Sequence, residues 1–571
     1  MPSTLSPAPK GPPPPSLVAR WTRLLSSRIP ENNSHPVQVA IRTYSLALCL
    51  SLVPSLIPFA TSRASEKTSK HALKRLLARE FGLGGFAFSI TLALGGGSLI
   101  RELWRALDDL DDSDAPETAA RAAAAKLRAC LSALNLSSAQ KTFFSSVVSS
   151  SAGLLLLQAG RRRSQNTKSP SRDPSASRTL DLTLLCLVRA IDAAVQSFVA
   201  RKSGSRRESD AEHPTHRAQT NKLASSLRRE VMRTQIDSVV FWACSARIMW
   251  CFFYEPHRLP KSYVKWINTL AGLDPRLLDT LRAIRARKWS YRTGSPTHSH
   301  LLTTYARDLG HPASWGDPSV LPAYGGPQAD QVWKELEVTT RPGVGGLPCQ
   351  MVHGQVGSTL GLEHSCTANA GLRGSKVLLE AIAIYLPVQF LPVILSRPRT
   401  LLDPRRILAS ALGALRSATF LTAFVTSYWY SVCLSRSLIL ARLFPFISHD
   451  FWDGPYGCVL AGCLVCGSSI WIENGRRRGE MALYVLPRAV RTCLPDAWVR
   501  SGNAGVRLAE RIAFVVSLSS LLTAASHYPH VLRGLSRWGL RFIIKGPNVV
   551  FWANNSPSSP KPSNVPSKTG E

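Results

Sequence analysis

The amino-acid sequence predicts an all-α protein, a multi-pass transmembrane helical bundle with eight or nine spans and an internal duplication. Three observations lead to this prediction: apolar blocks of helix-spanning length, basic clusters at the ends of those blocks, and a similar order of segments in both halves. A bilayer core about 30 Å thick requires roughly 20 apolar residues in helical form, because only a helix satisfies its own backbone hydrogen bonds in hydrocarbon.

The candidate spans differ in charge. Seven blocks are almost free of charged residues and cover residues 44–60, 81–100, 142–160, 377–395, 417–434, 455–472 and 512–526, of which the last is short. Two more blocks, 179–200 and 238–254, contain the ionisable residues Asp181, Arg189, Asp192 and Arg247. Each of these two could be a span in the bundle interior or a helix at the membrane surface.

These blocks divide the chain into five regions. We predict a disordered or amphipathic N-terminal region (1–40), a first transmembrane half (41–254), a soluble loop domain ending in a Cys/His turn (255–375), a second transmembrane half (376–530) and a basic, disordered tail (531–571). The Ser-, Pro- and Arg-rich tracts 161–178 and 201–216 are also predicted to be disordered, because they cannot bury a core.

The net charge of +33 suggests nucleic-acid binding at first sight, but the distribution of the charge excludes that interpretation. Basic residues gather at the ends of apolar blocks, where they meet anionic lipid headgroups and set topology. No zinc-finger, RRM or KH signature accompanies them. We therefore expect membrane lipids as partners, through anionic headgroups at the basic turns, and no nucleic acid; the sequence does not identify protein partners.

The basic loops of the second half predict its orientation. The loops 397–406 and 476–491 are both rich in arginine and share one side by parity, whereas 435–454 has two arginines against two aspartates. Positive loops mark the cytosolic side, so 435–454 is expected on the opposite side. In the first half nearly every loop is basic, and its orientation stays open.

Two parts of the chain share an order of features that indicates duplication. The turn Gly160–Arg163 follows an apolar block and precedes a Leu-rich helix that contains Arg189, and Gly475–Arg478 stands in the same relation to Arg488. The preceding blocks 81–103 and 409–434 are both rich in small residues, which let membrane helices approach closely. The alternative is that basic turns and Leu-rich helices recur by composition alone.

A Cys/His group lies just before the sixth apolar block. Its members are Cys349, His353, His364 and Cys366. Two thiolates and two imidazoles could complete a tetrahedral zinc site. However, a single residue separates His364 from Cys366, which is tight for two ligands of one ion, and this spacing favours ordinary reduced thiols in a turn before the membrane.

Ionisable residues in or near the spans mark further candidate sites, because such groups are costly in hydrocarbon unless they are paired or face water. Glu380 lies one turn into its block and either has a function or reaches the interface; Arg416 marks an interface. A charge cluster at the end of the eighth block could pair internally, bind lipid phosphate or only anchor topology; its members are Glu473, Arg476, Arg477, Arg478 and Glu480.

The sequence contains no Walker loop, no G-x-S-x-G, no H-E-x-x-H and no dinucleotide fingerprint. We therefore expect no enzymatic activity, no catalytic residue and no cofactor, apart from the zinc ion that the Cys/His group could hold.

The second half resembles the transmembrane protein 135 family over about residues 348–499. The resemblance is carried by Cys349 with His353, His364-Ser-Cys366, Ile384-Tyr-Leu-Pro387, Arg416-Ser-Ala-Thr-Phe-Leu421 and Ile472-Glu-Asn-Gly-Arg-Arg-Arg-Gly-Glu-Met-Ala-Leu-Tyr484. Residues 83–109 are similar to the family's second repeat, although here they come first.

This resemblance implies a peroxisomal or mitochondrial membrane protein that supports organelle organisation and dynamics and lipid homeostasis, and it supplies no catalytic residues. Two alternatives remain at this point. A transporter or channel for lipid-related metabolites is suggested by the duplication and by Glu380, Arg189, Asp192 and Arg247. A zinc-dependent membrane enzyme would depend on the Cys/His group alone.

Overall fold

The computed structural model describes residues 33–61, 70–108, 135–166, 179–208, 216–295, 297–339, 341–396, 403–499 and 503–546. These residues are helical or irregular, and their only β-pairing is an isolated bridge between Ser290 and Gly294, so the prediction of an all-α protein is confirmed. The chain forms two compact units, and we describe each separately. Unit 1 takes its described residues from Met1–Asp173, Arg189–Ser203 and Leu508–Glu571, and unit 2 from Pro174–Val188 and Gly204–Arg507.

Unit 1 is built around α4, which packs against both α2 and α6. Its helices are α2 (Pro36–Thr61), α3 (Lys70–Phe81), α4 (Phe86–Asp108), α6 (Ser138–Asn166), the middle of α7 (Leu180–Glu208), most of α21 (Ala504–His527) and α22 (Gly534–Lys545). Small residues allow the close contact of α4 with α6, since a Cβ added to Gly153 would lie 2.7 Å from the backbone nitrogen of Ala93.

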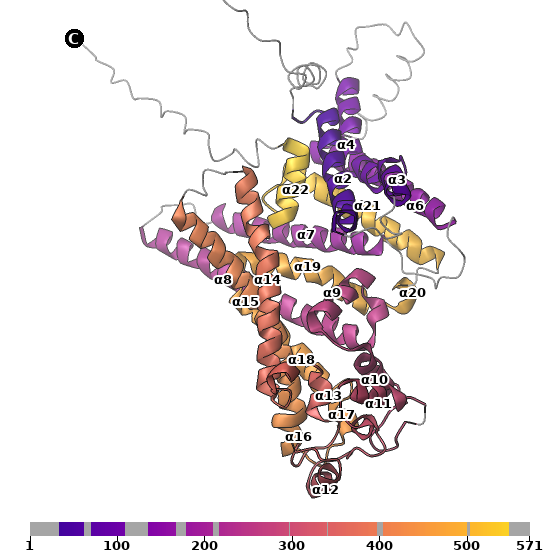
Figure 1. Ribbon diagram of the computed structural model, residues 1–571. Helices are drawn as coiled ribbons and strands as arrows, with labels where there is room; N and C mark the ends of the chain where they lie inside the picture. Colours follow the sequence, from indigo (N-terminus) through magenta and orange to yellow (C-terminus); the bar gives the residue numbers. More distant parts are fainter. Residues whose placement is uncertain are drawn as a thin grey trace, which may run out of the picture. The chain divides into compact units, whose positions relative to one another are not determined.

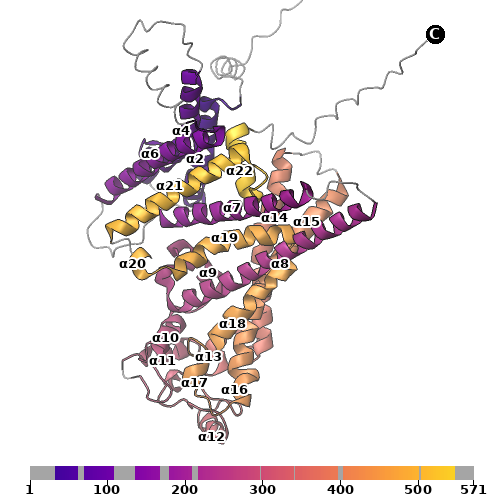
Figure 2. The same cartoon turned by 180° about the vertical axis from the view of Figure 1, so that it is seen from behind.

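Unit 2 contains two long helix pairs, α14 with α15 and α8 with α19, which lie side by side in Figures 1 and 2. Its longer helices are α8 (His216–Tyr254), α9 (Lys261–Ala271), α10 (Pro275–Arg285), α11 (His300–Asp308), α12 (Pro327–Glu335), α14 (Cys366–Ser396), α15 (Pro404–Cys433), α18 (Cys458–Cys466) and α19 (Gly475–Cys493). Its short helices and turns are η2 (Pro256–Arg258), η3 (Ala313–Gly316), α13 (Cys349–His353), η4 (Ser358–Leu360), the π-helical η6 (Leu434–Leu438), α16 (Leu440–Leu443), α17 (His449–Trp452), η7 (Gly467–Ile472) and α20 (Asp496–Val499).

Six helical segments among the described residues are long and apolar enough to cross a membrane, which supports the prediction of a transmembrane protein. They are Leu73–Asp108, Ser138–Ala159, Leu180–Val199, Glu230–Tyr254, Pro404–Leu443 and Ala504–His527. Two predicted spans coincide with shorter apolar helices, Pro36–Leu52 and Cys458–Ile472. The predicted span 377–395 lies in α14, whose side chains after residue 390 are outside the described part. The count of eight or nine spans stays a prediction.

Three tracts that we predict to be disordered are partly helical. Helix α6 continues to Asn166, α7 continues to Glu208, and α8 begins at His216. Extending an existing helix adds one hydrogen bond per residue and avoids a new nucleation step, so Arg-rich ends can continue it. In the predicted tail, α22 forms because its apolar residues recur at helical spacing and bury Ile543. The other residues of these tracts, 167–178, 209–215 and 547–571, lie outside the described residues, as do residues 1–32 of the N-terminal region.

The segment 255–375 does not form a separate domain. Its residues Leu259, Ile267 and Leu278 share one hydrophobic core with Phe252 of α8 and Tyr428 of α15. A second core within the segment is rich in aromatic rings: Trp289, Tyr291, Tyr305, Trp315 and Trp333. The units therefore do not follow the linear halves of the sequence, because helices associate through complementary apolar faces and not through chain order.

Candidate functional site

A buried cluster of thiols and one imidazole lies where α13, the start of α14 and the end of α15 meet. Cys349, His353 and Cys366 each direct one potential ligand atom into it, and these atoms all lie within 4.8 Å of one another. Helix α13 begins directly after Pro348, and its i, i+4 spacing places Cys349 and His353 on the same face. The structure thus brings together three of the four residues that the sequence analysis considers as possible zinc ligands.

Cys433, the last residue of α15, joins the cluster. Its Sγ lies 3.6 Å from Nε2 of His353, and the Cys366 thiol makes side-chain hydrogen bonds with both Cys349 and Cys433. In the sequence, Cys433 lies inside the predicted span 417–434 and is not part of the Cys/His group. The signal that could have identified it is the polar run Ser435-Arg436-Ser437, which begins two residues later and is buried.

His364, the fourth possible ligand in the sequence, does not belong to this cluster. Its Nδ1 lies 2.7 Å from Nε2 of Gln350, and its side chain is 53% exposed. The reason is local, because Cys366 begins α14 and only one residue separates it from His364. The side chain of Cys366 therefore enters the thiol cluster, whereas that of His364 turns towards Gln350.

The hydrogen bonds of His353 determine its protonation. Its Nδ1 lies 2.7 Å from the carbonyl oxygen of Glu363, and because a carbonyl only accepts, Nδ1 carries the proton and donates. Burial lowers the pKa of His353, so the ring is neutral near pH 7. The lone pair of Nε2 is therefore available on the side that faces Cys433.

The guanidinium of Arg341 lies against the thiol cluster. It is 1% exposed, and its Nη1 lies 3.5 Å from Sγ of Cys349 and 3.2 Å from Oγ of Ser437. Among the described residues no carboxylate forms an ion pair with it, and its Nε has no hydrogen-bond partner. The hydrogen bond with Cys366, followed by burial, raises the pKa of Cys349 to about 12. The pocket thus contains a buried cation beside a neutral thiol.

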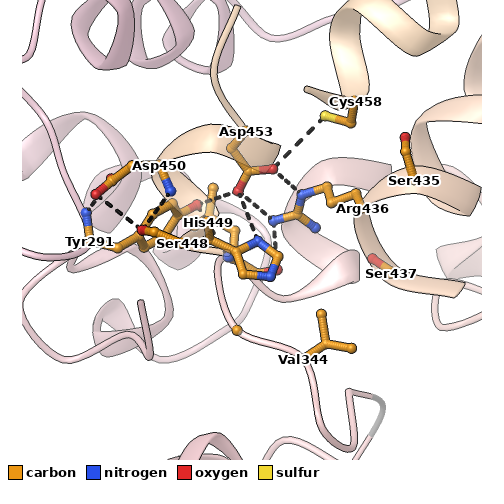
Figure 3. Close-up of polar contacts among 12 residues, drawn as sticks. Tyr291, Val344, Ser435, Arg436, Ser437, Ser448, His449, Asp450, Asp453 and Cys458 are labelled. Atoms are coloured by element: carbon orange, nitrogen blue, oxygen red, sulfur yellow. Dashed lines mark hydrogen bonds and ion pairs between the residues drawn. The ribbon is translucent and has the colours of Figure 1, made fainter. Parts of the chain in front are cut away.

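A second buried network is centred on Asp453 (Figure 3). Its carboxylate accepts hydrogen bonds from Nη2 of Arg436 at 3.1 Å and from the hydroxyl of Tyr291 at 2.5 Å, and Nδ1 of His449 lies 3.9 Å away. Arg436 also donates to the carbonyl of Leu347, two residues before Cys349. This network connects η6 and α17 to the segment that carries the thiols.

The predicted charge cluster is partly assembled around Glu473. This carboxylate is buried and accepts a hydrogen bond from Oγ of Ser417 at 2.8 Å, while Arg477 lies 3.8 Å from it and also donates to Ser417. The Arg416 guanidinium donates to the side chain of Asn474. Because α15 and α19 meet here, these contacts fix the turn at the end of η7.

The other predicted residues lie around or apart from this cluster. Arg478 donates to the carbonyls of Glu473 and Trp471, Arg476 is exposed, and Glu480 is half-buried. Glu380 is half-buried on α14, and the structure records no hydrogen bond or ion pair for it among the described residues.

Unit 2 also contains a partly open apolar cavity of about 190 Å³ that sequence patterns did not predict. Its walls come from α8, α9, α14, α15 and α19, and include Phe241, Phe253, Trp266, Tyr385, Phe424, Val425, Met481 and Tyr484. The guanidinium of Arg488 lies 3.9 Å from the ring centre of Tyr484 and 5.8 Å from that of Tyr263, two residues of the cavity wall. An apolar chamber with a cation against its wall suits an amphipathic ligand.

Comparison with known proteins identifies no relative: no protein-family model, no curated protein and no solved structure matches this chain.

Proposed function

We propose that this chain is a non-catalytic membrane protein of the peroxisomal or mitochondrial membrane that binds lipid and so contributes to lipid homeostasis and organelle organisation. The observation that supports this proposal is the apolar cavity between α8 and α15, since both helices belong to segments long and apolar enough to cross a membrane.

The dimensions of the cavity suit part of an acyl chain. A dry apolar cavity of about 150 Å³ holds benzene, so 190 Å³ accommodates a short length of hydrocarbon. Each buried methylene contributes about 0.8 kcal/mol. Arg488 forms no ion pair with a carboxylate among the described residues, so it is available for the carboxylate or phosphate of a lipid.

Filling the cavity tests lipid binding directly. Val425 lines the cavity from α15, and we expect Val425→Trp to reduce photocrosslinking of a diazirine fatty acid to the purified chain at least fivefold. Leu415→Trp is the matched control, because Leu415 lies on the same helix, is 47% exposed and does not line the cavity. Equal labelling of wild type and Val425→Trp would refute the binding site.

Removing the positive charge of Arg488 tests whether this residue recognises the carboxylate of a fatty acid. Arg488→Gln should weaken binding of a fatty acid about tenfold while leaving its methyl ester unaffected, because the ester has no charge to pair with. Competition against the photoprobe measures both ligands. A similar loss for acid and ester would show that Arg488 only supports the cavity wall.

The resemblance to the transmembrane protein 135 family supports the choice of organelles, and we propose the chain as a distant member of it. Co-fractionation of the tagged protein with peroxisomal or mitochondrial membranes, and resistance to carbonate extraction, are the expected results. Exclusive residence in the plasma membrane would contradict this part of the proposal.

We further propose eight or nine spans and two related halves. The packing in the two units supports a duplication, because α4 lies between α2 and α6 in the same chain order as α15 lies between α14 and α18.

Transport is less well supported than binding. Asp192 forms an ion pair with Arg533 at 3.0 Å, and Arg247 donates to the carbonyl of Thr492. Ionisable residues with fixed partners stabilise helix packing and do not require a substrate pathway to account for them.

A further inference from the structure

We propose that Cys349, His353, Cys366 and Cys433 form a closed structural zinc site that joins α13, α14 and the end of α15. This site is separate from the lipid cavity, and its occupancy does not depend on the proposed function. Its ligand set differs from the one considered from the sequence, because Cys433 takes the place of His364.

The distances fit one tetrahedral ion. Zinc bonds of about 2.3 Å to sulfur and about 2.0–2.1 Å to nitrogen place ligand atoms about 3.6–3.8 Å apart at tetrahedral angles. The observed separation of Nε2 of His353 from Sγ of Cys433 is 3.6 Å, and Cys349, His353 and Cys366 converge within 4.8 Å. Cys433 lies outside this converging group of three, so its thiol must turn further towards Cys349 and Cys366 when the ion binds.

The surroundings of His353 are those of a metal ligand. Imidazoles that bind metals generally donate their second ring N–H to a carbonyl or a carboxylate, which fixes the tautomer. His353 does so through Nδ1 to the carbonyl of Glu363. Its own carbonyl accepts from Nη2 of Arg373 at 3.0 Å, which holds the backbone of α13 in place.

Charge balance supports thiolate ligands. Three thiolates, one neutral imidazole and Zn²⁺ carry a net charge of −1, and binding releases three thiol protons to solvent. Arg341 supplies the compensating positive charge, because its Nη1 already lies 3.5 Å from Cys349 and no carboxylate pairs with it among the described residues. A buried guanidinium beside three protonated thiols would leave that charge uncompensated.

The ligand chemistry selects the ion. Three soft thiolates with one imidazole in tetrahedral geometry favour zinc over magnesium or calcium, which prefer oxygen ligands. Four protein ligands leave no open position, so the ion is structural and not catalytic. The site fastens the loop before α14 to α15, two elements far apart in the sequence.

Metal analysis of the purified full-length chain tests the proposal. We expect about one zinc per chain in the wild type and in two controls, His364→Ala and Cys463→Ala, and loss of zinc in Cys433→Ala. Cys463→Ala is the matched control, since Cys463 is also a buried thiol on a helix of unit 2 but lies outside the cluster. Retention of zinc by Cys433→Ala, or its loss in His364→Ala, would overturn the ligand set.

Cobalt substitution of the wild type keeps the test decisive if a variant does not fold. A tetrahedral cobalt spectrum with thiolate charge-transfer bands of three sulfur ligands is the expected result. A wild-type chain that takes up neither zinc nor cobalt would refute the site. A disulfide between Cys349 and Cys366, detected by mass spectrometry of the non-reduced chain, would refute it as well.

Discussion

At the residue scale, Asp453 is the carboxylate that balances the buried charge around η6. It is 4% exposed and forms an ion pair with Arg436, which is 3% exposed. We expect Asp453→Asn to destabilise unit 2 by about 3–5 kcal/mol, because it leaves a buried guanidinium without its counter-charge. The unfolding midpoint of the purified protein in detergent measures this loss.

A matched control for this change is available three residues away. Asp450 accepts hydrogen bonds from Tyr291 and Ser290 but compensates no buried cation, so Asp450→Asn should cost about 1 kcal/mol. Equal destabilisation by the two variants would show that the hydrogen bonds of Asp453 matter and its charge does not.

His449 gives the same network a pH dependence. Burial lowers the pKa of His449 well below 6.5; Asp453 opposes this shift, and the cations Arg341 and Arg436 reinforce it. The unfolded chain therefore binds a proton near pH 6.5 that the folded chain does not. The folded state is thus at its most stable, as far as His449 is concerned, above that pH, and it loses stability as the pH falls below it. The pKa of Asp453 is also lowered, which adds a loss only below its ordinary value of 3.8.

We predict that His449→Gln reduces the acid sensitivity of unit 2. Unfolding midpoints measured from about pH 7 to about pH 5 should fall less in the variant than in the wild type, because one proton-binding difference is removed. Identical pH slopes in the two proteins would exclude His449 as a contributor.

At the element scale, α4 and α6 depend on a glycine where they cross. A Cβ on Gly153 would lie 2.7 Å from the oxygen of Ser89 and 2.6 Å from Cβ of Ala93. Gly153→Val should therefore force the helices apart and destabilise unit 1 by about 1–3 kcal/mol. Gly539 lies in α22, and a Cβ added there would have no atom within 4 Å, so Gly539→Ala should instead stabilise unit 1 by about 0.5–1 kcal/mol. Thermal unfolding should show a lower melting temperature for Gly153→Val and a higher one for Gly539→Ala. An unchanged melting temperature for Gly153→Val would contradict the close contact of α4 with α6.

The sequence predicts the long apolar helices, but it does not predict Cys433 as a member of the cluster or the apolar cavity. Apolar runs near α4, α6, α8, α15 and α21 predicted the helices because hydrophobic length is a local property of the chain. Cys433 was missed because it lies far along the chain from Cys366 and no spacing rule connects them. The cavity also escaped prediction, since its aromatic walls, such as Phe241 and Tyr484, serve equally well as core residues in the sequence pattern.

At the scale of the whole molecule, contacts inside unit 2 link two segments that flank the spans. The backbone nitrogen of Gly325 donates to the carbonyl of Pro445 at 3.0 Å, and that of His449 donates to the carbonyl of Ala323 at 2.8 Å. The segment 255–375 and the turn 444–457 must therefore lie on the same side of the membrane. The contacts of Arg416 and Ser417 with the turn after η7 similarly place the middle of α15 beside the basic turn.

Together with the rule that positive loops are cytosolic, these contacts predict on which side of the membrane each segment of unit 2 lies. Loops rich in arginine stay in the cytosol, so 397–406 and 476–478 should be cytosolic and 255–375 should lie across the membrane. A tag inserted after Arg399 should bind antibody when only the plasma membrane is permeabilised. A tag at Val320, which is 43% exposed, should bind only after the organelle membrane is opened. If both tags respond alike, α14 does not cross the bilayer, and the segment that carries the thiol cluster shares the cytosolic side with the basic turns.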